Sequence, residues 1–256
     1  MTTDRSTLVA LADQFLALHR PGDPLVLVNA WDAASARAIA GAGARVIATS
    51  SAAVAAGLGE PDDDCMDVDL VFDVIRRISS ATSLPVTADV EAGYRLEPDE
   101  LIARLLAAGA VGCNVEDSDH RRPGEQVAAD AFAERLAGIR EAADAIGVHV
   151  VLNARIDTFL LGGTGSDAVD DVLARGRRYL AAGADCVYPI RLVDPAVVAV
   201  LAPALGGPLN VNVAPGGAIS ELAGAGAARV SVGPRGQHVA MERLGAFAAE
   251  VLHAVP

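Results

Sequence analysis

The chain has 256 residues, of which 52% are hydrophobic and only 4% aromatic, so a large core must be built mainly from Ala, Val, Leu and Ile. Its 20 basic and 33 acidic residues give a net charge of −13. A field of this sign repels phosphate backbones and anionic membranes, which argues against nucleic-acid and membrane partners. A small anionic substrate is still compatible with it, provided that a local cation overcomes the global field.

The three cysteines, Cys65, Cys113 and Cys186, are odd in number and widely spaced, without a CxxC motif. This usage is typical of a reduced protein without a structural zinc site. Residues 1–10 lack the apolar run of a signal peptide, and no apolar run approaches the roughly 18 residues that a membrane helix needs. We therefore expect a cytoplasmic protein.

Short β-rich runs alternate along the chain with Ala-rich amphipathic runs. The alternation predicts eight strands, at residues 25–31, 45–51, 85–91, 112–118, 149–157, 186–190, 209–213 and 229–233. It predicts helices at residues 33–42, 68–80, 98–108, 128–146, 167–182, 195–205 and 218–225. A glycine follows most of these helices, where a left-handed cap is expected, as at Gly43, Gly109, Gly147, Gly183, Gly206 and Gly226.

Strands separated by single helices predict right-handed parallel crossovers. Eight such units predict one α/β domain, residues 1–256, closed as a (β/α)8 TIM barrel. The alternative is an open doubly wound sheet, which is disfavoured because no GxGxxG motif follows the first strand. The active site of a barrel lies at the carboxyl ends of its strands, so the polar residues there are the functional candidates.

Three carboxylates stand at the ends of two neighbouring predicted strands, Asp89 and Glu91 on one and Glu116 on the next. Because side chains alternate along a strand, Asp89 and Glu91 are expected on the same face. Three carboxylates at one mouth make an oxygen-rich site suited to Mg²⁺, with Mn²⁺ as a possible substitute. The alternative is a salt-bridge network with Arg155, Arg95 or Arg191.

Neutral and cationic residues at other strand ends are candidates for substrate binding. Arg155 follows Asn153 with the same facing and can clamp a carboxylate in two-pronged fashion, or it can only neutralise Asp89 or Glu116. Asn153 and Asn212 are neutral donors for substrate oxygens.

Two loops above the mouth are also informative. Ser50, Ser51 and Ala52 are small enough for backbone N–H groups to approach an anion, although such a cluster also makes an ordinary turn or helix cap. Residues 117–124 carry His120, two arginines and a Pro-Gly turn. This loop either closes over an anionic substrate or is a solvated connection.

Seven motifs occur in order: NAWDAASAR, ATSSA, PVTADVEAGY, GCNVEDS, LNARIDTFL, GADCVYPI and ARVSVGP. Together they resemble the isocitrate lyase and phosphoenolpyruvate mutase superfamily over nearly the whole chain. The order ADVEAGY, VEDS, NARID is the most specific part of the likeness.

The resemblance implies a barrel whose last helix is swapped between neighbours in a homodimer or homotetramer. The apolar spacing at residues 244–255 agrees with such a helix. The resemblance further implies Mg²⁺ near Asp89, with Glu91 and Glu116 holding metal-bound waters. It also implies a catalytic aspartate at Asp62, in the stretch GEPDDD.

The same resemblance implies that the backbone at Ser50, Ser51 and Ala52 binds the substrate carboxylate, with help from Arg155. Trp31, in the first motif, is also expected to bind substrate. We assign catalytic roles to Asp62, Arg155 and His120.

The loop after the fourth strand departs from the pattern. The isocitrate, methylisocitrate and dimethylmalate lyases resemble one another there in a Lys-Cys-Gly-His stretch that supplies an acid–base cysteine, and the mutase and phosphonopyruvate hydrolase branch carries Lys-Thr-Asn-Ser. Here the loop reads Asp-His-Arg-Arg-Pro-Gly over residues 119–124. The resemblance therefore does not fix the reaction.

Cleavage of a 2-hydroxy di-acid needs a base and an acid, and the usual acid is missing. Decarboxylation of a 3-carboxy-2-oxo acid through an enolate needs no dedicated acid, because a metal can stabilise the enolate and solvent can supply the proton. This favours a metal-dependent carbon–carbon lyase of the oxaloacetate decarboxylase type. Three alternatives stay open. They are a methylisocitrate or dimethylmalate lyase with His120 or Tyr94 as the acid, phosphonopyruvate hydrolysis or mutase chemistry, and a non-catalytic 2-oxo acid binding protein.

Overall fold

The computed structural model describes residues 4–254. Its strands are β1 Leu25–Leu27, β2 Asn29–Ala30, β3 Ile47–Thr49, β4 Val86–Asp89, β5 Gly112–Glu116, β6 Val151–Ile156, β7 Cys186–Pro189, β8 Asn210–Asn212 and β9 Arg229–Ser231. Its helices are α1 Arg5–Leu16, α2 Ala33–Gly41, α3 Ser51–Leu58, α4 Val68–Ser79, α5 Pro98–Ala107, α6 Ala129–Ile146, α7 Gly165–Ala181, α8 Pro195–Leu205, α9 Ile219–Gly224 and α10 Arg235–His253.

All eight predicted strands are present, but the first one is divided at Val28. β1 pairs with β9, whereas β2 pairs with β3, so the chain passes from one sheet into the other at this residue. The sheets have the orders β1-β9-β8 and β2-β3-β4-β5-β6-β7, and every strand pair is parallel. A bridge between Val187 and Leu209 links their other ends. Because a doubly wound sheet reverses its strand order at a switch point, and neither sheet here does, the arrangement is (β/α)8-like.

The seven predicted helices are present, and their boundaries differ from the predictions by at most two residues. Gly147 and Gly206 adopt the left-handed conformation as helix caps, with φ of 76° and 77°. The structure adds α1 and α3, and the expected last helix, α10, begins at Arg235, before the apolar stretch predicted at residues 244–255. The side chain of Phe15 on α1 lies so close to Gly112 that a Cβ there would be 2.5 Å from the ring, so the start of β5 requires a glycine.

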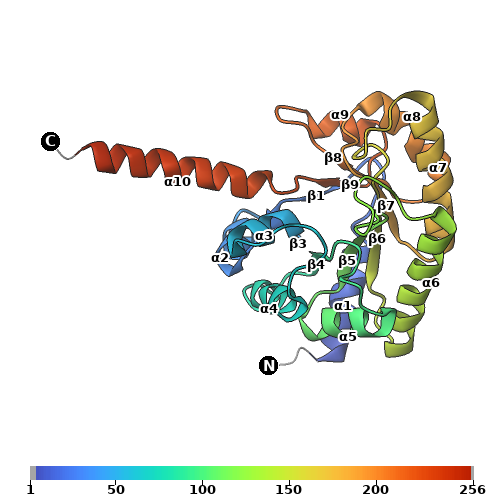
Figure 1. The fold of residues 1–256 in the computed structure, drawn as a ribbon, viewed down its shortest axis with the longest axis horizontal. Helices are drawn as coiled ribbons and strands as arrows, with labels where there is room; N and C mark the ends of the chain where they lie inside the picture. Colours follow the sequence, from blue (N-terminus) through green and yellow to red (C-terminus); the bar gives the residue numbers. More distant parts are fainter. Residues whose placement is uncertain (1–3, 255–256) are drawn as a thin grey trace.

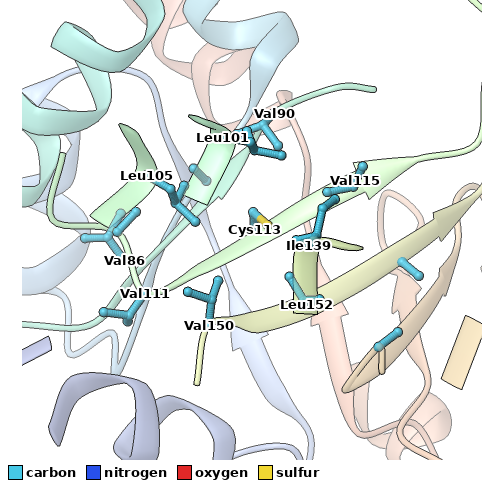
Figure 2. Close-up of a cluster of buried hydrophobic side chains, with 14 of the residues drawn as sticks. Val86, Val90, Leu101, Leu105, Val111, Cys113, Val115, Ile139, Val150 and Leu152 are labelled. Carbon is cyan, nitrogen blue, oxygen red and sulfur yellow. The ribbon is translucent and has the colours of Figure 1, made fainter. Parts of the chain in front are cut away.

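The core lies between the strands and the surrounding helices, and it is aliphatic, as the composition predicts. Figure 2 shows one part of it, where side chains of β4, β5 and β6 meet those of α5 and α6. Cys113 is buried in this cluster, and burial raises the pKa of its thiol to about 12, so it is an inert core residue as predicted. Cys186 is also buried, whereas Cys65 is exposed.

The last helix extends away from the rest of the molecule instead of packing on it (Figure 1). Of its side chains only Gln237 is buried, and its Nε2 donates to the Ala53 carbonyl at 2.8 Å. Leu244, Phe247 and Leu252 are 57%, 63% and 73% exposed. Residue 255, the last of the apolar stretch predicted from the sequence, lies outside the described residues. Over residues 4–254, no helix combines the length and apolarity needed to cross a bilayer.

Candidate functional site

A cavity of about 600 Å³, here called the central pocket, opens at the carboxyl ends of the strands. Its lining includes seven of the predicted site residues: Ser50, Ser51, Ala52, Asp62, Asp89, Arg155 and Asn212. A smaller cavity of about 200 Å³, the side pocket, shares Ser51, Asp62 and Arg155 with it and adds Glu91, Glu116 and His120. The structure therefore brings ten of the predicted residues to one mouth.

Asp89, the last residue of β4, is held on both sides. Its backbone N–H donates to the Thr49 hydroxyl at 2.9 Å. Its Oδ2 accepts hydrogen bonds from the backbone N–H and the hydroxyl of Ser51, both at 3.1 Å. Its other oxygen, Oδ1, is buried and has no partner among the described residues. A buried carboxylate oxygen without a partner is costly, so Asp89 is poised for a ligand or a cation.

Glu91 reaches the mouth by a route that strand alternation did not predict. β4 ends at Asp89, and Glu91 follows in the left-handed conformation with φ 50°. The backbone N–H of Asp64 donates to its carboxylate, and Oε1 is buried without a partner among the described residues. Burial, reinforced by the nearby Asp62 carboxylate, raises the pKa of Glu91 to about 8.

Asp62 lies on the segment between α3 and α4, and desolvation at the mouth raises the pKa of its carboxyl group. Two residues later, Asp64 is buried with φ 58°, and its side chain accepts from the Tyr94 N–H at 2.8 Å. The contacts of Asp64 with Glu91 and Tyr94 hold this segment against the loop after β4. The sequence signalled Asp64 only as one of three consecutive aspartates.

Arg155 joins the carboxylates of two strands. It forms ion pairs with Glu116 and with Asp157, the latter at 2.6 Å. Burial alone would lower the pKa of Arg155, but these two carboxylates outweigh it and raise the pKa. Glu116 is thus in a salt bridge with Arg155, as the alternative to a metal site predicted. Arg155 nevertheless lines both the central and the side pocket.

Glu116 also contacts the loop that follows β5. His120 Nε2 lies 2.7 Å from Glu116 Oε1, and this hydrogen bond raises the pKa of the imidazole. Burial raises the pKa of Glu116, and Arg155 opposes that rise. His120 is therefore fixed at the wall of the side pocket by a charged neighbour.

The oxygen donors fit a hard cation, although they do not converge as closely as the sequence suggested. Within residues 4–254, no three His, Cys, Asp or Glu side chains come close enough to hold one ion directly. Mg²⁺ commonly uses one or two carboxylates and keeps several waters. The unpartnered oxygens of Asp89 and Glu91 suit that mode.

The asparagines at the mouth differ in what they offer. Both polar atoms of the Asn212 amide already have hydrogen-bond partners within the protein. Its Nδ2 donates to the Tyr188 hydroxyl at 2.7 Å, and its Oδ1 accepts from the Arg191 N–H at 2.7 Å. Asn153 lies outside the pocket lining and donates to Asn114 at 2.7 Å. Tyr188 and Asn114 line the central pocket and were not among the predicted site residues.

Other residues lie apart from the central pocket. Trp31 lines a separate cavity of about 850 Å³ between α2, α3, α4 and the start of α10. Arg121 lines a fourth cavity, of about 380 Å³, whose wall includes His120. Arg122 is exposed and paired with Asp119 and Glu125 at 2.9 and 2.7 Å. Tyr94 is buried and lines neither the central nor the side pocket.

Comparisons with known proteins agree on one family. Residues 15–252 match the family model described as phosphoenolpyruvate phosphomutase. The chain is 32% identical over 219 residues to an uncharacterized protein of Mycobacterium tuberculosis, covering 86% of this chain and 81% of that one. It is 30% identical to the 2-methylisocitrate lyase of Escherichia coli, over 79% of this chain and 73% of the relative. It is 35% identical to a Bradyrhizobium oxaloacetate decarboxylase, over 54% and 48%.

Solved structures share the fold. A phosphonomutase candidate from Burkholderia cenocepacia is 44% identical, with a TM-score of 0.89, covering 93% of this chain and 99% of that one. A phosphonopyruvate hydrolase, solved in complex with oxalate and Mg²⁺, is 21% identical with a TM-score of 0.83, over 95% and 87%. At this identity, the second likeness concerns the fold alone.

Proposed function

Because the chain belongs to the phosphoenolpyruvate phosphomutase family, within the isocitrate lyase and phosphoenolpyruvate mutase superfamily, we propose that it is a Mg²⁺-dependent carbon–carbon lyase. Its substrate is a small 2-oxo or 2-hydroxy di-acid, and its reaction is decarboxylation of the oxaloacetate type through an enolate. One observation carries the proposal: the Asp89 carboxylate lines the central pocket with one oxygen held by Ser51 and the other unpartnered.

The proposal includes a metal and a closed scaffold. Asp89 would hold the ion directly, with Glu91 and Glu116 acting through water, and Mn²⁺ would replace Mg²⁺. The two sheets would form one closed (β/α)8 barrel in a single domain, since the chain at Val28 and the Val187–Leu209 bridge connect both of their ends. The extended α10 would be swapped between copies.

In the proposed reaction, the C3–C4 bond of oxaloacetate breaks and its electron pair moves onto the C2 oxygen, which gives an enolate and CO₂. Protonation at C3 then gives pyruvate. A bound Mg²⁺ would supply a Lewis acid beside the 2-oxo group. Arg155 and the backbone at residues 50–52 would hold the substrate carboxylate, and Asp62 would assist at the mouth.

The loop after β5 supports decarboxylation over a reaction that needs a dedicated acid. It carries neither cysteine nor lysine, so a carbanion leaving group has no familiar proton donor there. His120 is held against Glu116 at the side pocket, at 2.7 Å. It would deliver the proton to C3, although solvent could also do so.

A second candidate is a methylisocitrate-type lyase, which is favoured by the more extensive match to the Escherichia coli enzyme. That reaction would make His120 the acid in place of a cysteine. Hydrolysis or rearrangement of phosphonopyruvate is a further alternative, because the chain is 44% identical to the phosphonomutase candidate. The alternative from another class, a non-catalytic 2-oxo acid binding protein, would have little reason to keep costly carboxylates at a mouth.

A substrate screen with Mg²⁺ tests these candidates. Oxaloacetate, methylisocitrate, isocitrate, dimethylmalate and phosphonopyruvate would each be incubated with the protein, and pyruvate or another 2-oxo product would be measured. Because oxaloacetate decarboxylates slowly by itself with divalent ions, the Asp89→Ala variant serves as the matched blank. We expect oxaloacetate to be turned over fastest. Preferential turnover of another substrate would replace the decarboxylase assignment, and oxalate binding without any turnover would favour the binding protein.

The remaining parts of the proposal concern the surroundings of the enzyme. A small 2-oxo acid would be its ligand, with no nucleic acid or membrane as partner. A homodimer or homotetramer would be its assembly, and the cytoplasm its location. The assembly is the part that the exposed apolar face of α10 supports.

A further inference from the structure

The side-chain amide of Asn114, which lines the central pocket, is held in one orientation by two buried donors. Asn114 Oδ1 accepts hydrogen bonds from Asn153 Nδ2 at 2.7 Å and from Arg229 Nη2 at 3.1 Å. A guanidinium has five donors and no acceptor, so only the amide oxygen of Asn114 can face Arg229. The Asn114 Nδ2 group must therefore point the other way.

That other direction is toward the pocket that Asn114 lines. Among residues 4–254, Asn114 Nδ2 donates to no protein atom, whereas the amide groups of Asn29 and Asn212 are both occupied. Asn114 pairs in register with Asp89 on the adjacent strand, so its free amide stands beside the carboxylate with the unpartnered oxygen. A neutral donor at this position suits an oxygen atom of an anion.

Arg229 is an unusual residue to find beneath a pocket. It is fully buried, and its Nε and Nη1 have no partner in the described part of the chain. It forms no ion pair there, and its guanidinium carbon lies over the ring of Phe15, 5.8 Å from the ring centre. A buried charge without a counter-ion destabilises the fold, so packing alone does not explain it. It does place a fixed positive charge under a pocket of a chain with net charge −13.

We propose that Asn114 binds substrate by donating a hydrogen bond from Nδ2 to an oxygen of the 2-oxo acid, and that Arg229 is a positioning residue that holds the amide in this orientation. The choice of a 2-oxo acid rests on the proposed function. The orientation itself follows from the hydrogen bonds of the chain.

Oxalate is the probe, because its binding needs no turnover. Its affinity for the Mg²⁺-loaded protein would be measured by calorimetry in the wild type, Asn114→Leu and Asn210→Leu. Asn210 is a matched control: it is also a buried asparagine on a parallel strand, but it does not line the pocket. We expect Asn114→Leu to weaken oxalate binding about 10- to 100-fold, as for loss of a hydrogen bond to a charged group, and Asn210→Leu to change it less than about twofold.

Arg229→Met and the double variant test the positioning role. If Arg229 acts through Asn114, Arg229→Met weakens oxalate binding, and adding Asn114→Leu costs little more. Independent, additive losses would overturn that role. Should Arg229→Met fail to fold, the side-chain amide resonance of Asn114 in the wild type, assigned by its absence in Asn114→Leu, provides a second measurement, and it should shift when oxalate binds.

The outcomes separate this inference from the proposed function. If the wild type binds oxalate and Asn114→Leu binds it equally well, the role of Asn114 is wrong and the proposed function stands. If the Mg²⁺-loaded wild type does not bind oxalate, the 2-oxo acid site itself is wrong, and the inference falls with it.

Discussion

Ser51 holds one oxygen of Asp89 with two donors, its N–H and its hydroxyl, both at 3.1 Å, while the second oxygen has no partner among the described residues. Ser51 is the first residue of α3, so the positive end of a helix also faces this carboxylate. The arrangement holds the carboxylate in one orientation and leaves its second oxygen free, as the proposed binding of a cation would require.

Removal of divalent metal should abolish activity. We expect EDTA to eliminate turnover and Mg²⁺ or Mn²⁺ to restore it, because Asp89 presents a ready oxygen donor. Asp89→Ala should lower kcat by several orders of magnitude, measured on the best substrate of the screen. Cys113→Ser, at a buried position that pairs in register with Ala88 on the same two strands, should leave the chemistry nearly unchanged. Full activity in the chelated enzyme would refute the metal assignment.

The arginines of the loop after β5 should differ in importance. Replacing Arg121 and Arg122 together with Ala should raise KM and lower kcat, while changing oxalate affinity much less, if this loop closes over the distal anionic group of the substrate. Arg122 is paired with Asp119 and Glu125, whereas Arg121 lines the cavity beside His120. Arg121→Ala should therefore account for most of the effect on KM.

The single variants decide this point by steady-state kinetics. A double variant that matches wild type would show that the loop is a solvated connection. A larger effect from Arg122→Ala than from Arg121→Ala would mean that the ion pairs of Arg122, not a contact with substrate, shape the loop.

The apolar face of α10 should mediate self-association. Leu244→Glu places a charge among exposed apolar side chains and should reduce the oligomer mass measured by light scattering at micromolar concentration. Ala249→Glu introduces the same charge on the side of the helix that carries Glu242 and His253, and it should leave the mass unchanged. A monomeric wild type would contradict the prediction outright.

Buried His19 should make the fold sensitive to acid. Burial, with the nearby Arg229 charge, lowers the pKa of its imidazole to about 4, while Nδ1 lies 3.2 Å from the Phe15 carbonyl oxygen. In the unfolded chain the pKa is about 6.5, so the unfolded state takes up a proton first as the pH falls. The stability is therefore complete above pH of about 6.5 and decreases toward pH 4, by roughly 3 kcal/mol for this group.

His19→Asn keeps a donor for the Phe15 carbonyl but cannot titrate. Urea unfolding between pH 7.5 and 4 should show a weaker loss of stability for this variant than for wild type. His253→Asn, at an exposed position on α10, should follow the wild type at every pH. A constant difference between wild type and His19→Asn across this range would show that His19 does not titrate as described.

Periodicity and helix caps are local properties, which is why the sequence located the elements well. Apolar spacing, the glycines after helices and the polar residues at strand ends determined parallel strands alternating with helices and indicated a mouth containing Asp89, Glu116 and Arg155. The sequence also determined the aliphatic nature of the core and the burial of Cys113 and Cys186.

Only the tertiary structure decided how these groups are used. Glu91 lies beyond the end of its strand in a left-handed conformation, so the alternation rule did not apply to it. Trp31 faces another cavity because its neighbours are set by α3, α4 and α10, not by its own motif. The orientation of Asn114 depends on Arg229, 115 positions along the chain. Hydrogen-bond partners so far apart leave no periodic trace in a sequence, since folding alone brings them into contact.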